Sequence, residues 1–500
     1  MKDLKAKTIR GGAARMMAQI ANFVFRIGSV MIMARLLLPQ DFGLVGMVTA
    51  FTGVLNLFRD FGLSTATVQR EEVTDQQLST LFWINTLVGA VLAVLALIFA
   101  PLVVRIYHEP RLLPITMVLS LGFLFNALGV QHTAVLQRQL RFTALAVINV
   151  ASLVVSTIVA IAMAKLGFGY WALVAQTITL PLSTTVGVFI AAGWFPGRPH
   201  YGDEIRSMMK FGGTLTLNGL VVYVGYNMDK VLLGRYWGAE DLGLYGRAYQ
   251  LISIPTDNLN QSVGEVAFSA LSRVQNDRPR LRNYFLKGYS LVLGMTIPIT
   301  IMCAVFANDL ISVLLGPKWG SAVPIFRLLA PTILIFAMIN PLAWLMFALG
   351  MVKRSLQVAL VLAPVVMCGY FAGLHYWSQM GMRNGPEGVA LGYSAIMILW
   401  VIPHIAWCVK DTGVSLGDIL VTVARPLFSG LIGVALAFAV HHFCVPIMPA
   451  LPRLVIAGVV LMCVYVAILF FVMGQKALYI DVLKGFRKSK PVDENALATA

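Results

Sequence analysis

The sequence predicts an all-α polytopic membrane protein with about 14 transmembrane helices. Hydrophobic residues make up 58% of the 500 residues and charged residues only 12%, whereas a soluble domain carries about 25% charged residues. Apolar runs of the roughly 20 residues that cross a bilayer recur along the chain. These runs are expected to be helices, because an open strand in lipid would leave its backbone groups unpaired.

Short polar loops separate the expected spans, and spans one, seven and eight are the least apolar. No loop is as long as the roughly 50 residues of a small soluble domain. The spans are predicted at residues 13–34, 42–62, 78–104, 112–134, 143–165, 170–193, 209–234, 242–266, 285–307, 323–349, 355–377, 386–408, 425–445 and 453–474.

Lysine and arginine are distributed unequally between the two sides of these spans. If the N-terminus is cytoplasmic, the inner segments hold 25 of them and the outer segments 9. Because cytoplasmic loops carry the excess of basic residues, both termini are predicted to be cytoplasmic. The same bias explains the net charge of +16 without nucleic acid. The cysteines and histidines show no ligand spacing, and neither a metal nor a cofactor is expected.

An internal repeat organises the chain. Arg35, Asp41, Gly43, Leu44 and Gly46 recur 200 positions later as Arg235, Asp241, Gly243, Leu244 and Gly246. Six expected spans separate the copies, and an even number gives both the same orientation, so two parallel six-helix lobes are predicted, with two C-terminal helices added. The expected divisions are a first lobe at 1–200, a second lobe at 201–415, two further spans within 416–475 and a cytoplasmic tail at 476–500.

Polar residues in the first span predict a hydrated surface. Gln19, Asn22 and Arg26 are spaced so that they share one helix face. A charge at mid-bilayer costs at least about 2.5–3.5 kcal/mol and normally faces a bundle interior or a water-filled cavity. These three residues are therefore candidates for a substrate cavity, and a structural ion pair of Arg26 with another span is the alternative.

Charged residues also interrupt spans seven and eight. Asp229 is a candidate for ion coupling or for a bridge to a basic residue, and Asn218 upstream of it is a cavity candidate. Asp257, in a polar cluster of span eight, is a second ion-coupling candidate. Arg247 opens span eight, where it meets either an anionic substrate group or the membrane interface. Lys230 need not pair with Asp229, because neighbouring helix residues point in different directions.

No catalytic constellation is recognisable, and an enzyme is not predicted. The chain has no nucleophile elbow, phosphate-binding glycine loop or metal triad. His441 and His442 have no carboxylate near them in sequence, which favours a core or interface role over metal ligation.

Three motifs resemble the polysaccharide-unit flippases (Wzx-type, polysaccharide transporter family) of the multidrug/oligosaccharidyl-lipid/polysaccharide (MOP) superfamily. The motifs are ARLLLPQDFGL at 34–44, MDKVLLGRYWG at 228–238 and FSALSRVQ at 268–275. Within this family, the chain resembles the subgroup that exports colanic acid or xanthan repeat units. The family usually has proline where this chain has Ser269. The resemblance implies a MATE-like fold with a cationic cavity, to which Arg26 and Arg247 would contribute.

The same resemblance implies the function. The expected protein is a flippase of the bacterial inner membrane that moves undecaprenyl-diphosphate-linked oligosaccharide by alternating access, for exopolysaccharide or lipopolysaccharide synthesis. Its expected partners are this lipid-linked oligosaccharide, membrane lipid, and a polysaccharide polymerase with export machinery. A MATE-type drug/cation antiporter is an alternative, although its lumen should be acidic. A lipid-linked peptidoglycan-precursor flippase is another, and a membrane enzyme would need a large catalytic loop that the sequence lacks.

Overall fold

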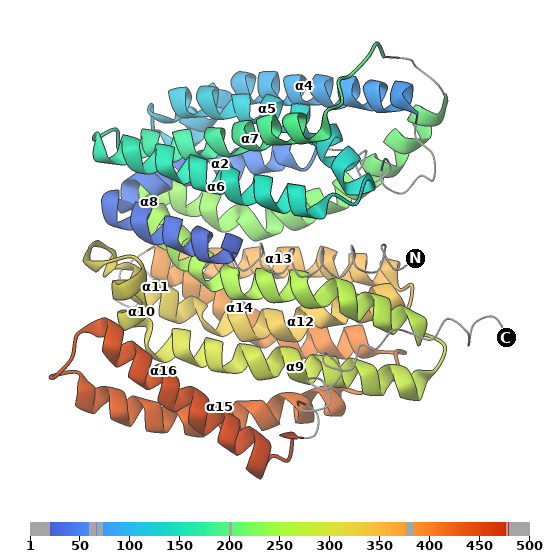
Figure 1. The fold of residues 1–500 in the computed structure, drawn as a ribbon. Coiled ribbons are helices and arrows are strands. Elements are labelled where there is room, and N and C mark those ends of the chain that lie inside the picture. The colour runs from blue at the N-terminus through green and yellow to red at the C-terminus, as the bar shows by residue number, and fades with distance from the viewer. Residues whose placement is uncertain are drawn as a thin grey trace. The chain divides into compact units, whose positions relative to one another are not determined.

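In the computed structural model, every regular element among the described residues is a helix (Figure 1). The structure describes residues 21–59, 67, 74–199, 203–376, 385–476 and 479. Within this part, the side chains of 203–222, 224, 257–263, 265, 266 and 269 are outside the description. The all-helical prediction is therefore confirmed for the described chain.

The helices follow one another with short connections. A first helix covers residues 21–36. The others are α2 (Pro39–Asn56), α4 (Asp75–Tyr107), α5 (Leu112–Arg138), α6 (Phe142–Lys165), α7 (Tyr170–Ala192), α8 (Asp203–Arg273), α9 (Arg278–Val305), α10 (Ala307–Leu314), α11 (Ala322–Leu329), α12 (Pro331–Ala348), α13 (Val352–Tyr376), α14 (Pro386–Val409), α15 (Leu416–Cys444) and α16 (Ala450–Ala467), with a 3-10 turn at Pro317–Trp319 and a π-helical turn at Ile468–Val472.

Ten helical segments of the described chain are long and apolar enough to cross a membrane. They coincide with expected spans three to six and nine to fourteen, most of them to within a few residues at each end. The other four expected spans fall on the first helix, on α2 and on the two parts of α8. Three of these four are the spans that the sequence marks as least apolar.

Helix ends follow from local side chains. Thr74 accepts a hydrogen bond from the backbone N–H of Gln77 at 3.3 Å, and Ser415 accepts one from that of Asp418 at 3.1 Å. Each cap satisfies a donor that the first turn of a helix leaves free, and so begins α4 and α15 where the sequence changes from loop to apolar run.

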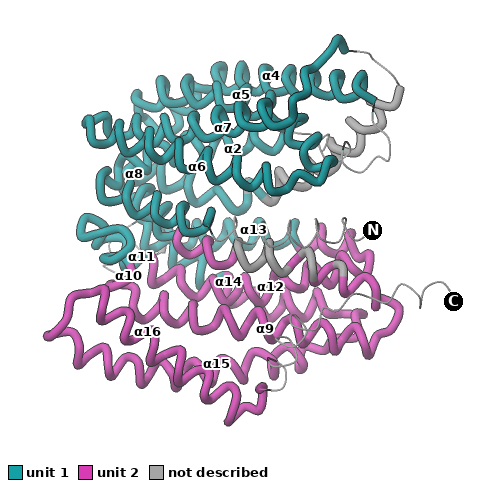
Figure 2. The backbone as a smooth tube through the Cα atoms, in the orientation of Figure 1, with its two compact units in different colours: residues 1–250, 311–325, 359–396 teal, residues 251–310, 326–358, 397–500 magenta. Residues whose placement is uncertain are grey.

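Residues group into two compact units, which Figure 2 shows in different colours. The first comprises residues 1–250, 311–325 and 359–396, and the second comprises 251–310, 326–358 and 397–500.

The helical segment α8 turns back on itself. Its helical backbone runs from Asp203 to Arg273, but Gly238 has φ 83° and ψ −170°, which breaks the helix into two limbs. Glycine takes this backbone conformation without the steric penalty that a side chain would bring. The predicted spans seven and eight are these two limbs, and the break lies in the loop expected between them.

The two copies of the repeat pack directly on each other in the first unit. A Cβ atom on Gly43 would lie 1.6 Å from the carbonyl oxygen of Ala239, and a Cβ on Gly243 would lie 1.9 Å from that of Pro39. Because Pro39 and Ala239 are themselves 200 positions apart, the contact is reciprocal. A two-fold relation between the copies gives such a contact, and glycine is required on both sides of it.

The second unit packs around α9, which contacts α12, α15 and α16. Pro298 lies inside α9 and has no N–H for the carbonyl of Gly294. The hydroxyl of Tyr465, on α16, donates to that carbonyl at 2.8 Å. The added C-terminal helices thus complete a hydrogen bond that the proline leaves open.

Candidate functional site

The break at Gly238 brings the charged pair of the first limb of α8 next to the second limb. Lys230 lies over the ring of Tyr249, with its Nζ 5.7 Å from the ring centroid. Asp229 interacts electrostatically with Tyr245. Residues 16 to 19 positions apart thereby form one cluster within the first unit, in which Asp229 and Tyr245 are buried.

Asp229 is completely buried, at 0% exposure. Its Oδ1 accepts a hydrogen bond from the backbone N–H of Lys230 at 2.8 Å, whereas Oδ2 has no close hydrogen bond in the described structure and the carboxylate's further interaction is with the Tyr245 hydroxyl. A buried carboxylate oxygen without a partner is unfavourable, and such a group normally takes a proton, a cation or water. The arrangement fits a residue that binds or releases a charge.

Several tyrosine side chains interact electrostatically with this carboxylate. Tyr370 and Tyr393 stack with ring centroids 5.3 Å apart, and Tyr393 lies 6.5 Å from Tyr249. The hydroxyls of Tyr370 and Tyr393 are buried and make no hydrogen bond within the described part of the chain. We call Asp229 with Tyr245, Tyr249, Tyr370 and Tyr393 the Asp229 cluster. It combines a buried carboxylate with aromatic rings, whose faces attract cations.

Lys230 is held apart from Asp229. Its Nζ donates to Oδ1 of Asn227 at 2.6 Å, one turn earlier on the same limb. The side chains of Asp229 and Lys230 therefore do not form an ion pair with each other, in agreement with the sequence argument.

Arg247 is engaged by neighbouring side chains. Its guanidinium lies 4.0 Å from the ring centroid of Phe42, a cation–π contact, and its Nη1 donates to Oε1 of Gln250. Phe42 in turn packs edge-on against Trp319, with centroids 5.4 Å apart. The side chain of Arg247 is half-buried.

The other predicted site residues are less fully placed. Arg26 is exposed on the first helix, and Asn22 one turn earlier is half-buried. Arg26 makes no hydrogen bond or ion pair with any residue that the structure describes. Gln19 and the side chains of Asn218 and Asp257 lie outside the description.

A charged cluster in the second unit was not predicted. Arg453 donates from Nε to Oδ2 of Asp309 at 2.7 Å and from Nη2 to Oδ1, and Nε2 of His441 lies 2.6 Å from the same Oδ2. The predicted interface role of His441 fits this contact. Its carboxylate partner is 132 positions away, and sequence proximity gave no signal of it.

No group of three His, Cys, Asp or Glu residues among those the structure describes is arranged to hold a metal ion. The cluster of Asp309, His441 and Arg453, called the Asp309 cluster below, contains only one carboxylate and one histidine. The carboxylate contacts both His441 and Arg453. The arrangement of this cluster is that of a structural contact between α10 and the α15–α16 hairpin.

Comparison with known proteins identifies the family. A family profile described as "Polysaccharide biosynthesis protein" matches residues 32–324. The lipopolysaccharide biosynthesis protein WzxC of Escherichia coli (strain K12) is 25% identical over 448 residues, which cover 87% of this chain and 88% of that protein. The teichuronic acid biosynthesis protein TuaB of Bacillus subtilis (strain 168) is 31% identical over 297 residues, which cover 58% of this chain and 61% of that protein.

A solved structure shares the fold. The lipid II flippase MurJ in an inward closed conformation superposes with a TM-score of 0.71, covering 91% of this chain and 98% of MurJ at 16% sequence identity. At this identity the likeness concerns the fold alone. The Wzx-type resemblance inferred from the three sequence motifs is confirmed by the family match and the relatives. The chain belongs to the polysaccharide biosynthesis protein family.

Proposed function

We propose that the protein moves undecaprenyl-diphosphate-linked oligosaccharide units from the cytoplasmic to the outer leaflet of a bacterial inner membrane by alternating access. The observation that carries this proposal is the match to a lipopolysaccharide biosynthesis protein over 87% of the chain. The protein acts without covalent chemistry or a cofactor, as a transporter. The unequal distribution of lysine and arginine supports cytoplasmic termini.

The negative charge of the proposed cargo complements a positive charge in the first unit. A diphosphate is an anion, and Arg26 is an exposed cation on a helix that also carries Asn22. Guanidinium groups bind phosphate oxygens with two parallel hydrogen bonds, which makes arginine well suited to this contact. Arg26 with Asn22 and Gln19 is our proposed contact for the diphosphate, with Arg247 and Asn218 as further candidates. A polymerase and export machinery would receive the flipped unit.

Deletion of the gene tests the cargo and the direction. Lipid-linked oligosaccharide should accumulate and be accessible to sugar-modifying reagents in inverted vesicles but not in right-side-out vesicles. A normal distribution between leaflets would contradict the proposal. Accumulation of lipid-linked peptidoglycan precursor would favour a peptidoglycan-precursor flippase. Drug sensitivity with normal polymer synthesis would favour a drug/cation antiporter.

Asp229 is our proposed coupling residue, with Asp257 as a second candidate. Asp229→Asn removes the charge but keeps the size, so gradient-driven transport in vesicles is expected to fall at least tenfold, because the neutral side chain cannot exchange a proton or cation. Lys230→Met is the matched control: its side chain bonds to Asn227, and transport should fall less than threefold. Rates of the Asn variant that equal wild type under imposed proton and sodium gradients would make Asp229 structural.

A further inference from the structure

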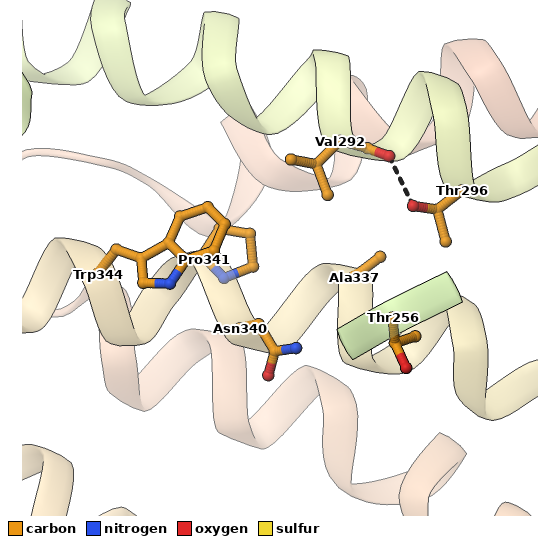
Figure 3. Close-up of a pocket in the computed structure, with 7 residues that line it drawn as sticks. All are labelled: Thr256, Val292, Thr296, Ala337, Asn340, Pro341 and Trp344. Carbon is orange, nitrogen blue, oxygen red and sulfur yellow. Dashed lines mark hydrogen bonds between the residues drawn. The ribbon is translucent and has the colours of Figure 1, made fainter. Parts of the chain in front are cut away.

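A pocket in the second unit lies between three helices. It is lined by residues of α8, α9 and α12: Thr256, Val292, Thr296, Ala337, Asn340, Pro341 and Trp344 (Figure 3). Each helix contributes at a position near the middle of its predicted span. Substrate sites of membrane transporters of repeat architecture commonly lie near the bilayer midplane.

The polar groups of this pocket have unused hydrogen-bonding capacity. The amide of Asn340 and the indole N–H of Trp344 have no partner in the described chain. Thr256 donates to the carbonyl of Ser253 at 2.8 Å and Thr296 to that of Val292 at 2.7 Å, which leaves both hydroxyl oxygens free to accept (Figure 3). The pocket therefore offers both donors and acceptors.

The proline of α12 adds to this. Pro341 has no N–H, so the carbonyl of Ala337, four residues earlier and also at the pocket, lacks its usual helical partner. Inside a membrane such groups must be met by water, by protein or by a ligand. A cluster of unmet polar groups at this depth is thus evidence for a polar occupant.

The described lining of the pocket does not suit an ion. None of the seven lining residues that the structure describes carries a charge. A diphosphate would call for lysine or arginine, and a cationic drug would call for a carboxylate. The occupant that fits is neutral, carries several hydroxyl groups, and has an apolar face that can pack on an aromatic ring.

The dimensions admit one small polar group. The room for the centre of a water-sized group is about 10 Å³, within an empty space of about 250 Å³ that is open to solvent. Roughly 10–15 Å³ is enough for one water, and a hydroxyl group is of similar size. In Figure 3, Trp344 lies at one end and the two threonines at the other, with Asn340 between them.

We propose that this pocket is a subsite for a single neutral sugar residue of the cargo, and this inference rests on the proposed function. One hydroxyl enters the pocket, the amide of Asn340 and the threonine oxygens bind ring hydroxyls, and the ring packs beside Trp344. In the unloaded protein, water occupies these positions and the sugar replaces it with equivalent hydrogen bonds.

Binding of two probes tests the subsite in the full-length protein reconstituted in lipid nanodiscs. The probes are undecaprenyl diphosphate alone and the undecaprenyl-diphosphate-linked oligosaccharide extracted from a strain lacking the transporter. The wild-type protein should bind the oligosaccharide-linked probe at least tenfold more tightly than undecaprenyl diphosphate alone. Asn340→Leu and Trp344→Leu should each reduce that preference about tenfold while leaving the Kd for undecaprenyl diphosphate unchanged, which also shows that the variants are folded.

Two matched variants sharpen the result. Trp344→Phe keeps an aromatic ring and should retain more of the preference than Trp344→Leu. Gly264→Ala would place a Cβ 2.9 Å from Nε1 of Trp344 and should lower the preference by moving the indole. A wild-type preference that neither leucine variant changes, or an equal loss for both probes, would overturn the subsite alone. Absence of any wild-type preference would overturn the proposed function together with the subsite.

Discussion

Gly43→Ala is expected to destabilise the protein severely and to reduce polymer synthesis at least tenfold. The added Cβ would lie 1.6 Å from the carbonyl oxygen of Ala239 and 2.5 Å from its carbonyl carbon. These are backbone atoms, so no side-chain rotation relieves the clash and the two copies of the repeat must move apart. Overpacking that forces backbone shifts costs about 1–3 kcal/mol, and occasionally more.

Gly243→Ala should have the same effect, because its Cβ would meet the carbonyl of Pro39 at 1.9 Å. Gly246→Ala is the matched control in the same motif, with no atom within 4 Å of its added Cβ. Alanine is favoured over glycine in helices by about 1 kcal/mol, so this variant should be neutral or stabilised. Thermal unfolding of the detergent-purified variants measures the difference, and equal midpoints for Gly43→Ala and Gly246→Ala would refute the contact.

Arg453→Leu is expected to lower the stability of the second unit by about 3–5 kcal/mol, because removing one partner of a buried ion pair leaves the other charge uncompensated. The side chains of Asp309 and Arg453 are only 5% and 15% exposed. The pair joins α10 to α16, and His441 of α15 contacts the same carboxylate. The α15–α16 hairpin should therefore be the region whose protection against hydrogen exchange falls most.

The pH dependence of this contact has a definite sign. Burial raises the pKa of Asp309, but the hydrogen bonds from Arg453 and His441 lower it by more, and the net pKa lies below the ordinary value. Asp309 thus contributes stability above its unfolded pKa of about 3.9, and this contribution is lost as the pH falls through the lower folded value. Unfolding midpoints of wild type should drop in this acid window, and those of Arg453→Leu should drop less.

An exposed ion pair provides the comparison for Arg453→Leu. Arg111 binds Glu109 with Nε 2.8 Å from Oε1, but its side chain is 40% exposed. Exposed pairs contribute at most about 1 kcal/mol, so Arg111→Leu should change the midpoint little. A midpoint for Arg453→Leu as close to wild type as that of Arg111→Leu would show that the Asp309 contact does not hold the hairpin.

Much of the fold could be predicted because membrane helices are set by local composition. Lipid requires every backbone group to be satisfied within its own segment, so an apolar run of sufficient length is already a helix and a span. The ten candidate spans of the described chain fall where the apolar runs do. Composition indicates a membrane span less strongly for spans seven and eight, because the charged residues Asp229, Lys230 and Arg247 interrupt their apolar runs.

The sequence alone determined the helical class, the repeat and the family motifs, because these depend on residue types at short or fixed spacing. Only the tertiary structure decided which distant groups meet. The turn at Gly238 places Asp229 with Tyr245, and the packing of α10 with the C-terminal hairpin places Asp309 with Arg453 and His441. Reciprocal contact of Gly43 and Gly243 gives the repeat its physical meaning. Contacts between residues far apart in sequence depend on how helices pack, and composition and periodicity do not encode that directly.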